Sequence, residues 1–226
     1  VCSAAGGTEM KTDPGRIWIN TGLLLLAAAL FLWAYNGQES RRAGDSAQQV
    51  ITELTQSLTQ QPPAEAGADP DREEAPAVKL PEYLLDAQRE MPEKTVDGRD
   101  YIGVLSIPTL QLELPVQSRW SYPNLKEAPC RYSGSLYQND LIICAHNYAS
   151  HFGRLKTLQP GDILLFTDMD DQVVSFQMVE QETLDPYDQE AMTTGDWDLT
   201  LFTCTPGGQT RVTVRFQRVA PAHSQE

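Results

Sequence analysis

Two kinds of hydrophobic pattern divide the chain. Residues 17–35 are almost continuously apolar and carry no charged side chain. From Asp100 onward, apolar residues instead come in short runs that are separated by turn-forming residues. A long uncharged apolar stretch is typical of a transmembrane helix, and short runs between turn signals are typical of β-strands. The sequence therefore predicts an N-terminal anchor followed by a β-rich domain.

The apolar stretch, residues 17–35, is just long enough to cross a bilayer core of roughly 30 Å as a helix. Trp18 and Tyr35 lie near its ends, where interfacial aromatic side chains are expected. A cleaved signal peptide is the alternative, but residues 34–37 form a poor cleavage site. We expect an uncleaved, single-pass anchor in the cell membrane, with a cytoplasmic tail of residues 1–16 and an extracellular downstream domain.

Residues 36–99 are interpreted as a stalk and linker. Apolar residues at helical spacing predict a short amphipathic helix over residues 46–60. These residues are Val50, Ile51, Leu54 and Leu58. Residues 61–77 are rich in Pro, Ala, Asp and Glu, which predicts a disordered spacer. Residues 81–91 predict another short helix before the domain. No convincing lid segment precedes the domain, although residues 81–99 could occupy a substrate groove.

The domain proper, residues 100–219, is mainly β. Its pattern predicts about eight short strands with few helices, which indicates a closed barrel or a sandwich. The strands with the clearest pattern are residues 101–107, 112–117, 140–145, 162–167, 172–182, 199–204 and 211–219. Residues 122–127 and 150–157 predict short helical segments, residues 185–191 are irregular, and residues 220–226 form a polar tail.

One cysteine lies where a strand ends. The apolar run of residues 199–204 stops at Cys204, a Pro-Gly-Gly turn follows at residues 206–208, and Arg211 opens the next run. A cysteine at a strand end lies at the rim of a sheet, and an arginine across a tight turn can lie beside it. This arrangement suits a thiolate nucleophile with a cationic partner. The alternative is a core strand whose last residue is a buried cysteine.

A histidine lies in a similar position. His146 follows the buried apolar run of residues 141–145, whereas His151 falls in the next helical segment and His223 in the tail. A histidine and a cysteine at the ends of two central strands can meet at one end of a barrel. We therefore predict that His146 is the base that works with Cys204.

The alternating pattern of residues 211–219 predicts which face of the last strand its arginines are on. Because side chains alternate along a strand, Val212, Val214 and Phe216 form the core face and Arg211 points away from it. A guanidinium at this rim could hold a developing oxyanion or grip a substrate carbonyl. Arg215 and Arg218 are expected to be solvated strand arginines.

Composition excludes some functions. The formal net charge of −14 argues against a nucleic-acid partner, because no basic stripe is present to neutralise phosphates. No Cys-x-x-Cys pair is present, so a structural zinc site is poorly supported. Cys130 and Cys144 could form a disulfide, which would leave Cys204 as an odd, reactive thiol. We expect no metal and no cofactor.

These residues resemble those of the sortases, the membrane-anchored cysteine transpeptidases of Gram-positive bacteria. The segment Thr200-Leu-Phe-Thr-Cys204 fits the family's T-L-x-T-C signature, and an arginine opens the strand that follows. His146-Asn147 follows an apolar strand, although alanine replaces the glycine of the usual G-H-N. Residues 101–108 and 114–116 resemble the family's opening strands. The similarity covers residues 100–219 and the anchor.

The resemblance implies an eight-stranded sortase barrel and a two-step acyl transfer. Cys204 would attack a sorting signal of the L-P-x-T-G kind, His146 would move the proton, and Arg211 would stabilise the oxyanion or orient the substrate. Thr203 and Asn147 are further candidates for substrate contact. The acyl group would pass to an amine of a cell-wall precursor or of a pilin lysine. The enzyme class, B-like or pilin-type, stays open.

Three other functions stay open. A membrane-anchored cysteine peptidase would use the same residues but release the acyl group to water. A non-catalytic β-barrel could bind peptides. A metal module could use Cys130, Cys144, His146 and Cys204. A papain-like arrangement is disfavoured, because there the cysteine precedes the histidine in the chain.

Overall fold

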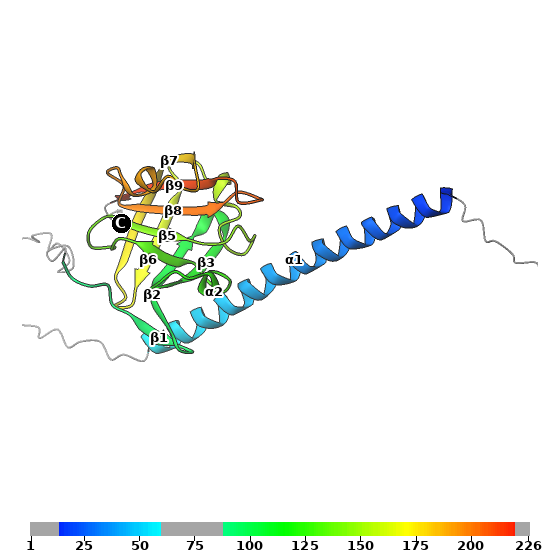
Figure 1. The fold of residues 1–226 in the computed structure, drawn as a ribbon. Helices are drawn as coiled ribbons and strands as arrows, with labels where there is room; N and C mark the ends of the chain where they lie inside the picture. The colour runs from blue at the N-terminus through cyan, green and yellow to red at the C-terminus, as the bar shows by residue number, and fades with distance from the viewer. Residues whose placement is uncertain (1–13, 60–87, 220–226) are drawn as a thin grey trace, which may run out of the picture. The chain divides into compact units, whose positions relative to one another are not determined.

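The chain divides into two compact units, residues 1–39 and residues 40–226. The computed structural model describes residues 14–59 and 88–219 (Figure 1). The predicted C-terminal tail, the predicted spacer, most of the predicted second linker helix and residues 1–13 of the predicted N-terminal tail lie outside the described residues. Gln88–Met91, the described end of that linker helix, contains no helix.

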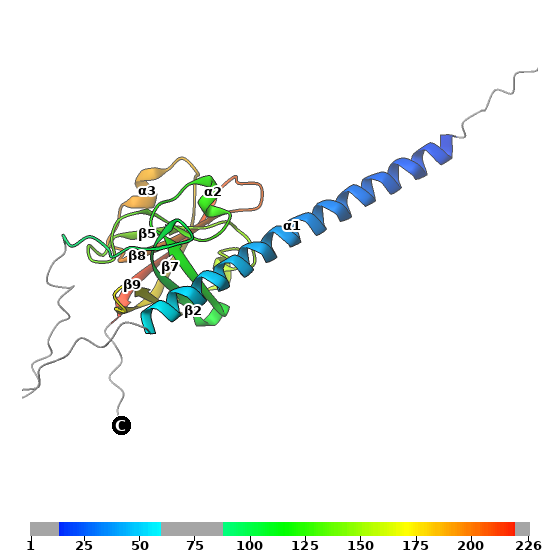
Figure 2. The same cartoon turned by 90° about the horizontal axis from the view of Figure 1, so that it is seen from below.

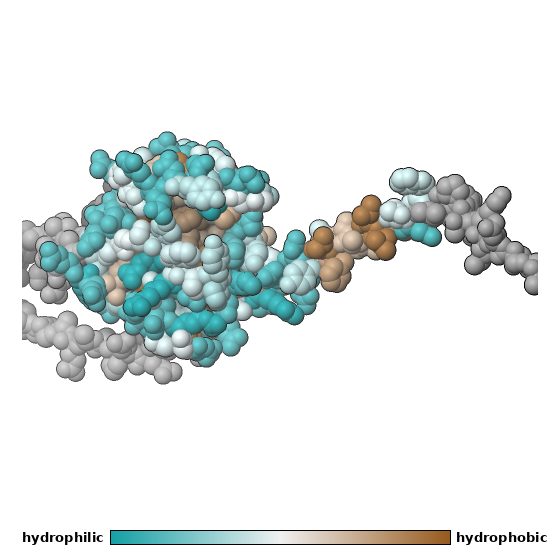
Figure 3. Space-filling view, in the orientation of Figure 1, coloured by the Kyte–Doolittle hydropathy of each residue, from teal (hydrophilic) through white to brown (hydrophobic). Residues whose placement is uncertain are grey.

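The first helix, α1 (Pro14–Thr59), is 46 residues long. Leucine and alanine dominate its first half and favour a helix, and Pro14 is tolerated because a first-turn residue needs no intrahelical N–H bond. The stretch Trp18–Leu54 is apolar and long enough to span a membrane by length and composition. The large apolar side chains between Trp18 and Tyr35 are exposed, and this part of α1 contains the brown segment in Figure 3.

The second half of α1 belongs to the unit that contains the β-strands. Ala43, Ala47, Ile51 and Leu54 are buried at spacings of four and three residues, which is one face of a helix. Leu54 is fully buried in a small cluster with Val96, Tyr101, Ala128 and Met169. The amphipathic prediction is confirmed, but the anchor and the stalk helix are one helix without a break.

The described residues form nine strands and four short helical segments. The strands are β1 (Lys94–Val96), β2 (Arg99–Ile107), β3 (Leu112–Gln117), β4 (Cys130–Ser133), β5 (Leu141–Cys144), β6 (Ile163–Asp168), β7 (Val173–Leu184), β8 (Leu199–Cys204) and β9 (Arg211–Val219). The helical segments are the 3₁₀ turns η2 (Pro108–Leu110) and η3 (Leu155–Thr157) and the α-helical turns α2 (Tyr122–Leu125) and α3 (Gln189–Thr193).

Eight of these strands close a barrel. The order is β1-β2-β3-β4-β5-β8-β9-β7-β6, and an additional pairing of β2 with β6 closes the ring, which leaves β1 outside it. Inside the ring, the inward-facing side chains form one hydrophobic core. Its fully buried members include Leu105, Leu141, Phe166, Phe176 and Leu201. The predicted mainly-β fold with an eight-stranded barrel is confirmed.

Several local predictions differ from the structure. β1 and β4 are short and partly polar, so no hydrophobic pattern marks them, and each is defined by its pairing with a neighbouring strand. The predicted helix over residues 150–157 is reduced to η3. In the segment expected to be irregular, Asp188 caps a short helix, α3, by accepting a hydrogen bond from the Ala191 amide at 2.9 Å.

The expectation for Arg215 was wrong. Val214 and Phe216 face the core as predicted, but the opposite side of β9 is also covered, and Thr213 and Arg215 are buried. Arg218 is half-buried, and its guanidinium donates a hydrogen bond to the Leu136 carbonyl at 2.7 Å. Strand alternation correctly separated the two faces, but it could not reveal that another segment covers the outer face.

Candidate active site

The site begins with two parallel strands that end together. β5 and β8 are hydrogen-bonded neighbours, with Cys144 opposite Phe202. The Ala145 amide continues this pairing by donating to the Phe202 carbonyl at 3.2 Å. His146 and Cys204 each follow this matched pair by two residues. Parallel strands in register therefore bring the two predicted reactive side chains to the same edge of the barrel.

A short hairpin brings the arginine to the other side of the cysteine. Cys204 pairs directly with Arg211 across the antiparallel strands β8 and β9. The connecting turn contains Gly207 and Gly208 at φ values of 86° and 73°, which glycine adopts without steric cost. Bonds of the Thr205 amide and hydroxyl to Thr210 close the base of the turn. The predicted tight return to Arg211 is confirmed.

Cys204, His146, Thr203 and Arg211 line one cleft of about 180 Å³. Its walls come from the β3–α2 region, β4, the ends of β5 and β8, and the segment between β7 and β8. The other lining residues are Trp120, Tyr122, Leu125, Tyr132, Cys144, Ala145, Asp185, Pro186, Asp188, Gln189, Met192 and Phe202. In the view of Figure 2, α2 and α3 both lie along the upper edge of the barrel.

The histidine is supported by a stack of rings. The centroids of the His146 and Tyr148 rings are 4.9 Å apart, and those of Tyr148 and His151 are 5.6 Å apart. His151 is completely buried, and burial, followed by the nearby His146, lowers its pKa to about 4. His151 is therefore neutral at physiological pH, and the stack supports the half-exposed His146 from the interior side.

The loop after His146 is tightly wound. The Phe152 amide donates to the His146 carbonyl at 3.2 Å, and the Gly153 amide donates to the Tyr148 carbonyl at 2.9 Å. A Cβ atom on Gly153 would lie 2.5 Å from the Asn147 carbonyl oxygen, so only glycine fits. These contacts fix the backbone that carries His146.

Arg211 presents its charge at the cleft edge. Its Nη1 atom donates to the carbonyls of Gly208 at 3.2 Å and Thr210 at 3.3 Å. These bonds hold the guanidinium against its own turn, on the strand next to Cys204. Because the guanidinium is planar, holding Nη1 in place also fixes the direction of its other N–H donors.

Sequence comparison now gives the family. A family model of the sortase domain matches residues 105–219, just over half of the chain. The chain belongs to the sortase family. No curated protein matches it.

Solved sortase structures have the same fold. Sortase C of Streptococcus pneumoniae aligns with a TM-score of 0.55 and 24% identity, over 76% of this chain and 97% of that one. Clostridium perfringens sortase C, solved with the C-terminal cell wall sorting motif, aligns with a TM-score of 0.54 and 18% identity, over 77% of this chain and all of that one. The similarity to these two structures is one of fold, that is, of the barrel architecture.

The three described cysteines of this sortase differ in environment. Cys130 and Cys144 are directly opposite across β4 and β5, yet both are free, buried thiols. Burial raises the pKa of Cys130 to about 12 and also raises that of Cys144. Cys204 is half-buried and lines the cleft. The possible disulfide is not formed, and within residues 14–59 and 88–219 no three His, Cys, Asp or Glu side chains are grouped to hold a metal.

The two further candidates for substrate contact differ in position. Thr203 is buried, and its hydroxyl donates to the Ala145 carbonyl at 2.8 Å, which ties β8 to the end of β5. Asn147 is exposed and does not line the cleft. In this sortase, Thr203 therefore supports the edge that carries His146 and Cys204.

The sequence did not reveal the aromatic wall of the cleft. The ring centroids of Trp120 and Tyr132 are 6.1 Å apart, and those of Tyr132 and Phe202 are 5.2 Å apart. The rings come from three segments that meet only in the folded barrel, and no local pattern joins them. Phe202 alone carried a signal, because it lies in the T-L-x-T-C signature.

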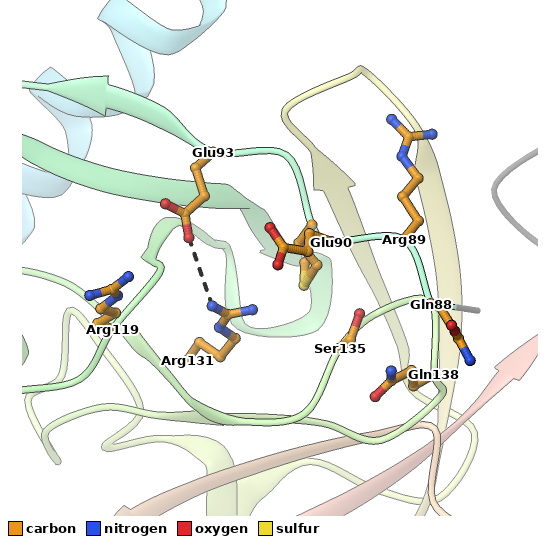
Figure 4. A pocket seen from close by; sticks show the side chains of 9 residues that line it. Gln88, Arg89, Glu90, Glu93, Arg119, Arg131, Ser135 and Gln138 are labelled. Carbon is orange, nitrogen blue, oxygen red and sulfur yellow. Dashed lines mark ion pairs between the residues drawn. The ribbon is translucent and has the colours of Figure 1, made fainter. Parts of the chain in front are cut away.

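A second hollow of about 650 Å³ lies elsewhere on the barrel (Figure 4). Arg131 and Glu93 form an ion pair across it at 3.7 Å, and Arg119 and Glu90 also line it. Its charges are mixed, and none of the predicted site residues line it. The chemistry of the family signature is concentrated in the smaller cleft.

Proposed function

We propose that this sortase is a cysteine transpeptidase in which Cys204 is the nucleophile, His146 the proton carrier and Arg211 the oxyanion-stabilising residue. The proposal is carried by one observation: β5 and β8 end in register, so His146 and Cys204 line one cleft together with Arg211. A thiol, an imidazole and a guanidinium at one accessible edge are the groups that acyl transfer requires.

In the first half-reaction, the Cys204 sulfur attacks the carbonyl carbon of the scissile peptide bond. Its thiol proton passes to His146, and the negative charge that develops on the carbonyl oxygen is met by Arg211. His146 then donates the proton to the leaving amine as the carbon–nitrogen bond breaks. The product is a thioester on Cys204 and a free amine.

In the second half-reaction, an incoming amine attacks the thioester carbonyl. His146 accepts the amine proton, the carbon–sulfur bond breaks, and the proton returns to the Cys204 sulfur. The net change exchanges one amide for another, with no redox step and no cofactor.

The substrate that we propose is a C-terminal sorting signal of the L-P-x-T-G kind. The acceptor is an amine of a cell-wall precursor or of a pilin lysine. Support comes from the two solved neighbours, one described with a sorting motif and the other in terms of pilin substrate specificity. α1 would anchor the enzyme in the cell membrane, with residues 1–16 in the cytoplasm and the barrel outside.

The test uses the full chain in detergent micelles. It is incubated with an L-P-x-T-G peptide, with and without an excess of a lysine-containing acceptor peptide, and products are analysed by mass spectrometry. We expect cleavage between Thr and Gly and incorporation of the acceptor amine. Cleavage with water as the sole acceptor would favour the peptidase alternative. Peptide binding without cleavage would favour the non-catalytic barrel.

A further inference from the structure

The cleft side of the β8–β9 hairpin is a ladder of three residue pairs. Cys204 pairs with Arg211, Phe202 with Thr213, and Thr200 with Arg215. Directly opposed residues of antiparallel strands point to the same side of a sheet, and alternate residues along each strand share that side. The first pair provides the proposed chemistry and Phe202 lines the cleft, so the third pair lies on the same side, further from the edge.

Arg215 is almost fully buried, with 2% of its surface exposed. Its Nε atom donates to Glu182 Oε1 at 2.8 Å, and the Nη2 atom lies 2.7 Å from the same oxygen. The Nη1 atom donates to the Met192 carbonyl at 2.9 Å and to Thr200 Oγ1 at 3.0 Å. The Nη2 atom also donates to the Ala191 carbonyl at 2.5 Å.

These partners join four elements. Arg215 is on β9, Glu182 on β7 and Thr200 on β8, and the two carbonyls belong to α3. The last carbonyls of a helix have no partner within the helix, and a cation there is electrostatically favourable. The planar guanidinium fork can hold a carboxylate and several carbonyls at once, which a lysine ammonium cannot do with the same geometry.

α3 is also a wall of the catalytic cleft. Asp188, Gln189 and Met192 line the cleft from this side. Met192 connects Arg215 to the cleft, because its carbonyl accepts a hydrogen bond from Arg215 and Met192 lines the same cleft as Cys204. α3 is only five residues long, so its own hydrogen bonds cannot hold it in one position. The hydrogen bonds from Arg215 tie it to the β8–β9 ladder, in addition to the buried Met192 side chain.

We propose that Arg215 is a positioning residue that sets the α3 wall of the cleft and thereby determines which substrate side chains fit beside Cys204. This inference rests on the proposed function. It predicts that losing Arg215 weakens substrate binding and selectivity and leaves the intrinsic reactivity of the Cys204 thiol unchanged.

The experiment compares the wild-type full chain in detergent micelles with four variants. Arg215→Met removes every donor, Arg215→Lys retains the charge without the fork, and Thr200→Val removes a single partner. Thr200→Val keeps the test decisive if Arg215→Met does not fold. Arg154→Met is the control, because the Arg154 guanidinium also donates to a carbonyl, that of Leu110, but Arg154 is exposed and does not line the cleft.

Three measurements are made on each variant. They are kcat and KM for sorting-signal peptides that differ at the position before the scissile bond, deuterium uptake across residues 185–198, and the Cys204 alkylation rates with iodoacetamide and with a peptidyl chloromethyl ketone. For Arg215→Met we expect KM to rise at least about tenfold with a much smaller change in kcat. We also expect faster uptake in α3, reduced peptide discrimination and an unchanged iodoacetamide rate.

Arg215→Lys should restore part of the KM loss, Thr200→Val should show a smaller shift in the same direction, and Arg154→Met should behave as wild type. The inference is overturned if Arg215→Met and Thr200→Val leave both KM and α3 uptake at wild-type values, or if kcat falls while KM does not change. If the wild type turns over no peptide, the proposed function has failed. The inference is then tested by the ratio of the Cys204 alkylation rate with the peptidyl chloromethyl ketone to that with iodoacetamide. We expect Arg215→Met to lower this ratio, and an unchanged ratio would contradict the inference.

Discussion

Cys204 and Cys144 are on adjacent parallel strands, yet they lie in different surroundings. Cys144 is the last residue of β5 and also lines the cleft, but only 5% of its surface is exposed, and burial raises the pKa of its thiol. Cys204 is the last residue of β8, is half-buried and borders the cleft with Arg211 directly opposite. The two cysteines at the ends of neighbouring strands therefore differ in how accessible their thiols are to a substrate.

Position at the barrel edge, more than residue type, therefore decides where chemistry can occur. In register, Cys144 lies opposite Phe202, so β8 extends beyond it by the two residues that place Cys204 in the open. The same offset carries His146 beyond the end of β5, whereas His151 returns to the interior. Accessible residues of this cleft edge should therefore respond to substitution differently from buried residues.

The largest effect is expected for the two cysteines. Cys204→Ala should lower kcat/KM by at least about 10³-fold, because no other group replaces the nucleophile. Cys144→Ala should leave kcat/KM near the wild-type value, because its buried thiol is protonated at neutral pH. Peptide cleavage assays on both folded variants give the comparison. Equal losses in the two variants would contradict the distinction between edge and interior.

The next effect concerns the two histidines. His146→Ala should reduce kcat by about 10²- to 10⁴-fold, because proton transfer to the leaving amine is lost. His151→Phe keeps a ring in the stack and should retain most of the activity. Steady-state kinetics with the sorting-signal peptide measures both. A His151→Phe loss as large as that of His146→Ala would mean that the interior histidine takes part in the proton transfer.

Arg211 should come third. Arg211→Ala should lower kcat by about 10²- to 10³-fold, which is the usual loss when one oxyanion donor is removed. Arg211→Lys should recover part of the loss, because the positive charge remains but the planar fork does not. The sharper contrast is with Arg215→Met, for which KM should change more than kcat. A KM effect alone at Arg211 would assign it to substrate binding.

A change in the interior should affect stability instead. Leu54, on the half of α1 that packs against the barrel unit, is completely buried with Tyr101, Ala128 and Met169. Leu54→Ala should lower the free energy of unfolding by about 2–5 kcal/mol, through lost burial and the cavity that remains. Urea unfolding followed by tryptophan fluorescence measures it. Unchanged stability would show that α1 is not part of the folded domain.

The smallest effect is a pH dependence from His151. Its pKa of about 4 in the folded protein lies below the unfolded value of 6.5, so the unfolded state binds its proton more readily. The stabilisation is complete above pH 6.5 and is lost as the pH falls toward 4, by up to about 3 kcal/mol. Urea midpoints between pH 7 and pH 4.5 should fall less for His151→Phe than for the wild type. Parallel curves would contradict this.

The cleft edge could be predicted from the sequence because its signals are local. A cysteine ends one apolar run, a histidine follows another, and a Pro-Gly-Gly turn returns the chain to Arg211. Each signal occupies a few consecutive residues, and the family resemblance fixes their order. The closed barrel followed from the same short runs and from the resemblance.

The remaining features depend on contacts between distant segments. Arg215 lies in an alternating strand pattern that indicates a solvated arginine, and only the segment before β8 covers it. The aromatic wall joins Trp120, Tyr132 and Phe202 from three separate elements. The second half of α1 has a clear apolar face, but the pattern does not show which surface that face covers. β4 is too short and polar to carry a pattern.

The account depends most directly on Cys204 as the nucleophile. The measurement that tests it is mass spectrometry of the full chain quenched with acid during turnover of a sorting-signal peptide library, followed by proteolysis and mapping of the modified residue. We expect a mass increase equal to the acyl portion of the peptide, located on Cys204 and removed by an added amine. An acyl group mapped to any other residue, or turnover retained in Cys204→Ala, would contradict it.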